Sequence, residues 1–246
     1  MKIIAIIPAR LQASRFPNKL LQDLCGKSVI VRTYQATVET QLFEEVLVAT
    51  DSKEIQEEIE SIGGRTYFST TPHDCGSNRI AEAAQEIDAD IVINVQGDEP
   101  FTNEDDLQAL IEVFKKDDKK EISMASLKHK LQDPVAIQDP NNVKVITDLK
   151  DNAIYFSRSP IPFERDNSIK CPVFKHIGIY AFRKDALIDF YKSEATPLEL
   201  TEKIECIRYL ERGKKIKMVA TSRHSIGIDT PSDLAKAREL WTKTYS

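Results

Sequence analysis

The stretch IIAIIP at residues 3–8, followed by ARLQASRFPNK at residues 9–19, decides the fold class of this chain. Five consecutive apolar residues before a proline are typical of a strand buried on both faces, as strands of parallel sheets are. Proline has no backbone N–H to donate to a neighbouring strand, so we expect the strand to end at Pro8. The eleven residues after Pro8 hold three cations, Arg10, Arg15 and Lys19, and no acid.

This cationic segment is a candidate anion site. Open α/β sheets bind their ligands beyond the carboxyl ends of the strands. Separated arginine and lysine side chains can neutralise several oxygens of a polyphosphate at once. The alternative is a solvated surface loop whose charges bind nothing.

The composition narrows the class of protein. The chain has 246 residues, 41% of them hydrophobic and 30% charged, and a net charge of −5. These values suit one large globular α/β domain with or without a small subdomain. An acidic chain without a basic tract argues against a nucleic-acid partner. The absence of a long apolar run and of a secretory signal pattern predicts a cytoplasmic protein without membrane insertion.

The four cysteines are far apart and form no C-x-x-C pair, so we expect neither a disulfide framework nor a metal cluster. Strand and helix patterns alternate over the first 116 residues. Apolar runs predict strands at 46–50, 66–68 and 91–95. Ser28, Ser77 and Thr102 are expected to cap the helices that accompany them. This alternation is typical of a parallel sheet with helices on both faces, whose loops after the strands share one edge.

The pattern changes after residue 120 and predicts a mixed, partly antiparallel subdomain. Strands are expected at 122–127, 143–147, 153–156, 175–182 and 215–220. Helices are expected at 184–192, at 200–212 and after Thr230-Pro231.

Two acidic loops are candidate Mg²⁺ sites. Asp98 follows the strand 91–95 in VQGDEP, and Asp229 precedes a helix start in GIDTP. Mg²⁺ is a hard ion that is often held by one or two carboxylates together with substrate phosphates. The alternatives are a plain loop acid at Asp98 and a carboxylate that favours the helix dipole at Asp229.

Other polar stretches have a functional and a structural interpretation. The loop before Arg79 could contact a base or a phosphate, or simply start a helix. Arg158 and His176 could grip a carboxylate or hydroxyls, although a single histidine on a strand is more often structural. Glu202 and Glu205 share a helix face that could accept sugar hydroxyls or face solvent.

Taken together, these stretches resemble one family over essentially the whole chain. The motifs are IIPARLQASRFPNK, LVATD at 47–51, VINVQGDEP at 92–100, PNNVKVITD at 140–148, IYFSRSPIP at 154–162, FKHIGIYAFR at 174–183, PLELTEKIECIRYLERG at 197–213 and GIDTPSDL at 227–234. In order and spacing they are similar to those of the 3-deoxy-manno-octulosonate cytidylyltransferase (CMP-Kdo synthetase) family. No G-x-G-x-x-G follows the first strand, which argues against a Rossmann dehydrogenase.

The resemblance implies an α/β fold of the nucleotide-diphospho-sugar transferase (Rossmann-like) type, with a mixed central sheet and a small antiparallel subdomain. It implies a single cytidylyltransferase domain over 1–246, with nucleotide binding in about 1–120 and sugar binding and dimerisation in about 121–225. The implied reaction moves CMP from CTP to the C2 hydroxyl of an eight-carbon 3-deoxy sugar acid, with Mg²⁺ and release of diphosphate, for lipopolysaccharide synthesis. The implied assembly is a homodimer.

Site residues follow from the resemblance motif by motif. Arg10, Arg15 and Lys19 would hold the CTP phosphates, with Arg10, Lys19 and Asp98 as the catalytic set. The nucleotide would also lie near Ala9, Gly76 and Arg79. Asp98 and Asp229 would bind Mg²⁺. The sugar acid would be surrounded by Gln96, Arg158, His176, Tyr180, Glu199 and Glu202.

The chain departs from the family pattern in two places. Cys75-Gly76-Ser77-Asn78-Arg79 stands where Ser-Gly-Thr-Glu-Arg is common. Leu200-Thr201 and Cys206 stand where His-Ile and Gln are usual. The second departure leaves the 8-amino analogue of the sugar as a rival substrate. Sialic-acid activation and a catalytically inactive nucleotide-binding protein are more distant alternatives.

Overall fold

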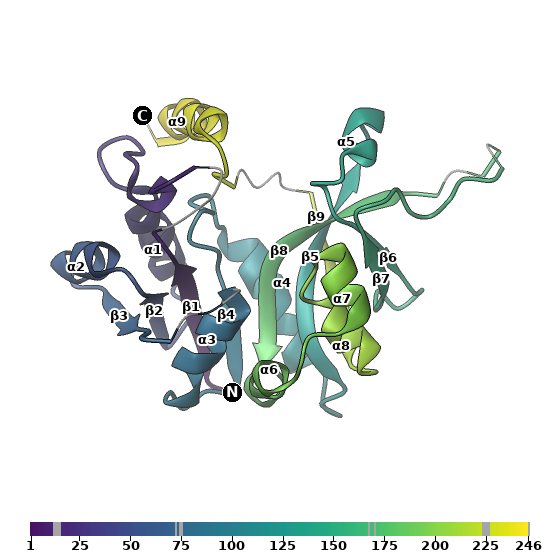
Figure 1. The fold of residues 1–246 in the computed structure, drawn as a ribbon, viewed down its shortest axis with the longest axis horizontal. Coiled ribbons are helices and arrows are strands. Elements are labelled where there is room, and N and C mark those ends of the chain that lie inside the picture. Colours follow the sequence, from purple (N-terminus) through teal and green to yellow (C-terminus); the bar gives the residue numbers. More distant parts are fainter. Residues whose placement is uncertain are drawn as a thin grey trace. The chain divides into compact units, whose positions relative to one another are not determined.

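The computed structural model describes residues 1–11, 16–71, 73, 76–166, 168–169, 171–222 and 227–245. The chain forms two compact units, Met1–Leu107 with Ser225–Ser246, and Gln108–His224. Figure 1 labels the helices and strands of both. No helix in these described ranges combines the length and the apolar character needed to cross a bilayer.

The first unit is built on four parallel strands in the order β3-β2-β1-β4 (Figure 1). Their bounds are Ile3–Ala9 for β1, Glu45–Thr50 for β2, Arg65–Phe68 for β3 and Ile91–Asn94 for β4. All seven residues of β1 are buried, as the apolar run predicts. Burial of a side chain such as Ile4 or Ile6 stabilises the fold by about 1.5–3 kcal/mol.

The prediction that Pro8 ends the first strand is wrong. Strand β1 continues to Ala9 and pairs with β2 through Pro8 and Ala9. The carbonyl of Ile6 accepts a hydrogen bond from Val95 N, so the backbone of Ile6 points towards β4. The backbone nitrogen of Pro8, two residues later in the same strand, points towards β4 as well. The pairing of β1 with β4 ends at Ile6, so no ladder bond is lost where Pro8 lacks its N–H.

The strands of this unit are connected by α1 (Val29–Glu39), α2 (Lys53–Ser61) and α3 (Gly76–Gln85), and a 3₁₀ turn η1 at Lys19–Leu21 precedes α1. Helix α9 (Pro231–Tyr245) also belongs to this unit, whereas α4 (Glu104–Lys115) begins in it and continues into the second. The connections from β1 through α1 to β2, and from β2 through α2 to β3, both run towards the β3 side of the sheet. The connection from β3 through α3 to β4 runs in the opposite direction. Because such crossovers are right-handed, α1 and α2 cover one face and α3 the other.

The helix starts are only partly as predicted. The Ser28 side chain accepts from Val31 N at 3.3 Å and caps α1. Helix α3 instead begins at Gly76, so Ser77 lies inside its first turn. Before α4 the capping side chain is Asn103 rather than Thr102, because Asn103 Oδ1 accepts from Asp106 N at 3.1 Å.

The second unit has a mixed sheet, as predicted. Its elements are β5 (Ile122–Leu131), α5 (Pro134–Gln138), β6 (Lys144–Thr147), β7 (Ala153–Ser157), β8 (Val173–Arg183), α6 (Lys184–Lys192), α7 (Pro197–Glu202), α8 (Ile207–Glu211) and β9 (Lys215–Thr221). Strand β5 pairs antiparallel with β8 and parallel with β9. The hairpin of β6 and β7 joins β8 through β6 (Figure 1).

One predicted helix, over 200–212, is instead two short helices. Helix α7 ends at Glu202, and Lys203 takes a left-handed conformation with φ 55° before α8 begins. Residues nine apart in a continuous helix lie on opposite faces. The break therefore allows Glu199 and Arg208 to meet as an ion pair.

Candidate functional site

Two carboxylates of the first unit converge on one ammonium. Lys19 Nζ lies 2.5 Å from Asp98 Oδ2 and 2.8 Å from Asp229 Oδ1. Lys19 belongs to η1, Asp98 follows β4, and Asp229 precedes α9. Three segments far apart in the sequence thus place their charges together beyond the carboxyl end of the sheet.

Backbone contacts fix the position of Asp98. Thr33 Oγ1, on α1, donates to the carbonyl of Gly97 at 2.9 Å. A Cβ at Gly97 would lie 3.0 Å from Pro8 O, so any larger residue would push against the backbone of β1. The carbonyl of Asp98 accepts from Ile228 N at 2.9 Å, which ties the segment of Asp229 to that of Asp98.

The charge of Lys19 is maintained by its partners. Burial by itself would lower the pKa of the ammonium, but Asp98 and Asp229 outweigh burial and raise the pKa above its ordinary value. Lys19 is therefore a cation throughout the physiological pH range. Its side chain is 14% exposed, against 24% for Asp98 and 52% for Asp229, so the cluster opens to solvent on the Asp229 side.

Arg79, expected near the nucleotide, joins the ends of two strands. Its Nη1 donates to the carbonyl of Ala9 at 2.9 Å, and its Nη2 pairs with Asp51 directly after β2. The residue is buried. The backbone of Gly76 opens the same helix, close to Pro8. The Arg79 guanidinium therefore links the carboxyl ends of β1 and β2.

Two further candidates of the first unit lie near the carboxyl ends of its strands. Arg10, a nucleotide candidate, follows β1 and is exposed, and Gln96, a sugar candidate, is half-buried between β4 and Asp98. Arg15, the third cation of the opening segment, lies outside the described residues. Gln96 belongs to the first unit, whereas the other sugar candidates belong to the second.

In the second unit, Glu202 and Arg158 form one network. Glu202 Oε1 accepts from Ser157 Oγ at 2.7 Å, and Oε2 accepts from the backbone N of Arg158 at 2.9 Å. The Arg158 guanidinium donates to three backbone carbonyls, those of Pro140, Glu202 and Lys203. A guanidinium has five N–H donors, so two are left for a ligand beyond these three bonds.

Lys144 supports this network from inside the fold. Its side chain is fully buried, and its Nζ donates to the carbonyls of Asp139, at 3.1 Å, and Arg158. Burial lowers the pKa of this ammonium, and the charge of Arg158 lowers it further, while Asp139 and Glu202 oppose the shift. Lys144 thereby holds the backbone on which the Arg158 side chain depends.

His176 lies within the second unit's sheet. Its Nε2 is 3.0 Å from Ser126 Oγ, which also lies 2.9 Å from the carbonyls of Ile177 and Ile179. Because the hydroxyl proton goes to a carbonyl, the geometry assigns the ring proton to Nε2, donating to Ser126. Burial lowers the pKa of His176 to about 3, so the ring is neutral at physiological pH. The Tyr180 ring packs against it at 5.4 Å between centroids.

Glu199 is committed to a buried ion pair. Arg208 Nε and Nη2 donate to its two carboxylate oxygens at 2.7 and 2.5 Å, and each side chain is 8% exposed. Glu199 also completes a capping box with Thr196 at the start of α7. The structure thus gives Glu199 a structural bond in addition to its predicted role at the sugar.

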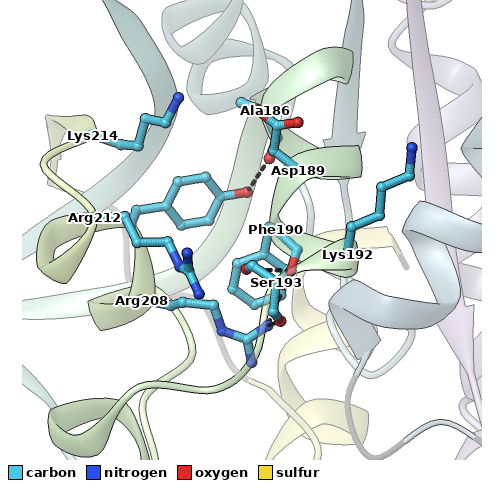
Figure 2. A pocket seen from close by; sticks show the side chains of 9 residues that line it. Ala186, Asp189, Phe190, Lys192, Ser193, Arg208, Arg212 and Lys214 are labelled. Atoms are coloured by element: carbon cyan, nitrogen blue, oxygen red, sulfur yellow. Dashed lines mark hydrogen bonds between the residues drawn. The ribbon is translucent and has the colours of Figure 1, made fainter.

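A pocket of about 460 Å³ lies beside this ion pair (Figure 2). In Figure 2, Arg208 faces Phe190 and Ser193, and its Nη1 donates to both of their carbonyls, at 3.1 and 3.0 Å. None of the predicted sugar-binding residues is among those that line the pocket. We therefore do not assign it to the substrate.

Comparison with known proteins gives a consistent result. The model of the family described as Cytidylyltransferase matches residues 4–216. A 3-deoxy-manno-octulosonate cytidylyltransferase of Christiangramia forsetii is 59% identical over 239 residues, covering 97% of this chain and 96% of the relative. Its counterpart in Flavobacterium johnsoniae is 54% identical over 240 residues, covering 98% of each chain. This chain belongs to the 3-deoxy-manno-octulosonate cytidylyltransferase family.

A solved structure extends the match to the fold. The CMP:2-keto-3-deoxy-manno-octonic acid synthetase complexed with CTP has a TM-score of 0.93 to this cytidylyltransferase, with 34% identity and coverage of 99% of both chains. The expected nucleotide-diphospho-sugar transferase fold is thereby confirmed.

Enzymes of this family typically use a divalent metal, and the donor set of this cytidylyltransferase fits one. Asp98 and Asp229 each turn an oxygen towards a common point, which Lys19 Nζ marks. Carboxylate oxygens are the ligands that Mg²⁺ prefers. Within the described ranges, no group of three or more His, Cys, Asp or Glu side chains could hold a metal. Two carboxylates suit an ion that takes its other ligands from substrate and water.

Several residues that bond to the candidate site residues were not predicted. Asp51 directly follows a predicted strand, at the end where the candidate residues lie, a signal that could have paired it with Arg79. Ser126 and Arg208 carry no such signal, because their contacts with His176 and Glu199 depend on strand register and on the helix break at Lys203.

Proposed function

We propose that this chain transfers CMP from CTP to the C2 hydroxyl of 3-deoxy-D-manno-octulosonate (Kdo), releasing diphosphate. The product, CMP-Kdo, would serve lipopolysaccharide synthesis. The observation that carries the proposal is the convergence of Lys19, Asp98 and Asp229 at the edge of the sheet, in a chain that belongs to this family.

In the proposed reaction, cationic side chains hold the triphosphate at the edge of the first unit's sheet. Arg10, Arg15 and Lys19 bind phosphate oxygens, and Arg79 keeps the backbone at Ala9 in place through its 2.9 Å bond. Displacement at a phosphorus atom depends mainly on positioning and charge neutralisation. Arg10, Lys19 and Asp98 are accordingly the proposed catalytic residues.

Asp98 and Asp229 are the proposed ligands of Mg²⁺. When bound, the ion would neutralise charge on the phosphate oxygens as diphosphate leaves. Gly97, whose carbonyl is held by Thr33, fixes the backbone before Asp98. The bond from Ile228 N to Asp98 O, at 2.9 Å, links the backbone of the two proposed ligands.

The proposed sugar site combines residues with different roles. Arg158 offers its two remaining N–H donors to the sugar carboxylate. The neutral His176 ring packs against the Tyr180 ring, and Gln96 is proposed to contribute an amide. Glu202 orients the backbone of Arg158. Glu199 is also assigned to the proposed sugar site, where its ion pair with Arg208 holds it in place.

We also propose the division of labour that the sequence predicts: nucleotide binding in about 1–120, and sugar binding and dimerisation in about 121–225. The homodimer and the cytoplasmic location are proposed from the family resemblance.

The 8-amino analogue of Kdo is the second candidate substrate, because the departures from the family pattern leave the exact sugar open. Leu200 and Thr201 are exposed where the family usually has His-Ile. Cys206 is buried, and burial raises the pKa of its thiol well above the ordinary value, so it stays neutral. A small neutral side chain therefore replaces the usual glutamine amide.

Diphosphate release tests the proposal. The chain is incubated with CTP and Mg²⁺ and, in parallel, with Kdo, its 8-amino analogue or N-acetylneuraminate. We expect release with Kdo above the other two. Faster release with the amino sugar would favour the second candidate, and no release with any sugar would contradict the enzyme assignment.

A further inference from the structure

Lys19 occupies the point that a divalent cation would need. Its ammonium nitrogen is 2.5 Å from Asp98 Oδ2 and 2.8 Å from Asp229 Oδ1. Mg²⁺ lies only about 2.0–2.1 Å from its oxygen ligands. An ammonium and a dication cannot both sit between the same two oxygens at these distances, and their charges repel each other. The ammonium therefore competes with the metal for the carboxylate pair.

The backbone of Lys19 is anchored while its head can move. The turn η1 is closed by bonds from Leu21 N to Asn18 O at 3.0 Å and from Gln22 N to Lys19 O at 3.3 Å. The neighbouring Leu20 is 4% exposed and lies 3.4 Å from the position of a Cβ on Gly97. A lysine side chain has a flexible four-carbon stem. Its ammonium can move to another anion without displacement of the turn.

We propose that Lys19 is an exchangeable counter-ion that makes metal binding depend on the nucleotide. Without nucleotide, its ammonium neutralises Asp98 and Asp229 and weakens divalent-cation binding to them. An arriving triphosphate offers the ammonium stronger anionic partners, and the released carboxylates then take the cation. This inference rests on the proposed function, because it requires triphosphate to bind beside Lys19.

The exchange has two separable consequences. Removing the ammonium should tighten metal binding in the absence of nucleotide, because the competitor is gone. Removing it should also weaken nucleotide binding in the absence of metal, because a phosphate contact is lost. By linkage, a ligand that frees the carboxylates for the cation must itself bind more tightly when the cation is present.

The first test is Mn²⁺ titration of the full chain without nucleotide, followed by electron paramagnetic resonance or calorimetry. We expect Lys19→Met and Lys19→Gln to bind Mn²⁺ at least about 10-fold more tightly than wild type, within the usual range of such couplings. The matched control is Lys27→Met, which removes one positive charge from a side chain that bonds to Gln35 at 2.7 Å. Its Mn²⁺ affinity should equal that of wild type.

The second test is CTP binding in EDTA, where we expect the two Lys19 variants to bind at least about 10-fold more weakly than wild type. Unchanged Mn²⁺ affinity in both variants would overturn the inference. Tighter Mn²⁺ binding with unchanged metal-free CTP binding would also overturn it, since Lys19 would then be a fixed counter-ion. Adding Asp98→Asn to Lys19→Met should abolish the gain in Mn²⁺ affinity, and a gain that persists would contradict competition at this pair. Neither measurement needs the sugar, so failure here with normal diphosphate release leaves the proposed function intact.

Discussion

Lys19 Nζ donates to Asp98 Oδ2 at 2.5 Å and to Asp229 Oδ1 at 2.8 Å, and so joins residues 79 and 210 positions away in the sequence. The relationship makes one side chain the centre of the proposed phosphate and metal sites. Asp229 is half exposed, so its ion pair adds only about 0–1 kcal/mol to stability, and for the less exposed pair of Lys19 with Asp98 the cost of desolvation offsets much of the attraction. Their placement is thus better explained by function than by stability.

Asp98→Asn should therefore reduce turnover far more than stability. We expect a loss of about 100-fold or more in the rate of diphosphate release, the scale typical of a lost electrostatic contact at a reacting group. The melting temperature should change by only about 2–4 °C, since Lys19 keeps Asp229. Asp88→Asn, at an exposed acid of the same unit, is the control and should keep wild-type turnover. Wild-type turnover in Asp98→Asn would refute the metal assignment.

Gly97→Ala should destabilise the first unit and displace Asp98. The new Cβ would lie 3.0 Å from the Pro8 carbonyl, a backbone atom that cannot rotate away. Overpacking of this kind costs about 1–3 kcal/mol, measurable by urea unfolding. The matched control is Gly178→Ala, where no heavy atom lies within 4 Å of the added Cβ and no loss is expected. Equal stability of the two variants would contradict the close approach at Gly97.

Glu199→Gln should unfold at a markedly lower denaturant concentration than wild type. The substitution leaves the Arg208 guanidinium buried without its carboxylate, a change that costs about 3–5 kcal/mol. Glu121→Gln is the control, because its pair with Lys215 is about half exposed and contributes little. If Glu199→Gln kept wild-type stability but raised the KM for Kdo, Glu199 would be a direct sugar ligand with no structural part.

His176 should make stability depend on pH below neutrality. Its pKa is about 3 in the folded chain and 6.5 when unfolded, so between these values the unfolded chain binds more protons. Stability due to the neutral ring is complete above pH 6.5 and is lost as the pH falls towards 3. From pH 7 to pH 5 the loss should be about 2 kcal/mol.

Urea unfolding at pH 7 and pH 5 checks this dependence. His176→Gln should remove most of the difference between the two conditions, since glutamine does not titrate. An undiminished difference in the variant would assign the pH dependence to other groups. Because the ring stays neutral, the turnover of wild type should show no step from His176 between pH 6 and 8.

The elements of the fold were largely predictable from local pattern. The apolar run 3–7 and the serine at position 28 predict a buried strand and a capped helix, and both are present. The local sequence pattern did not predict where β1 ends, because strand pairing decides that position. Pro8 remains in β1 because β4 stops pairing at Ile6, and the sequence does not contain that register.

The candidate site was predictable in its residue types and only partly in its contacts. Arg79 and Glu199 were expected at ligands, yet their nearest partners are Asp51 and Arg208. Those partners depend on the ends of neighbouring strands and on the break between α7 and α8. A motif identifies a residue that matters, but it does not distinguish a ligand contact from a supporting one.

The sequence by itself determined the parallel sheet of the first unit, the mixed second unit and the family, since periodicity and motif order are properties of the chain. Only the tertiary structure decided that Lys19 lies between Asp98 and Asp229. That contact requires η1, the loop after β4 and the segment before α9 to meet, through the close approach at Gly97 and the bond from Ile228 N to Asp98 O. Long-range contacts of this kind depend on packing, which no local pattern records.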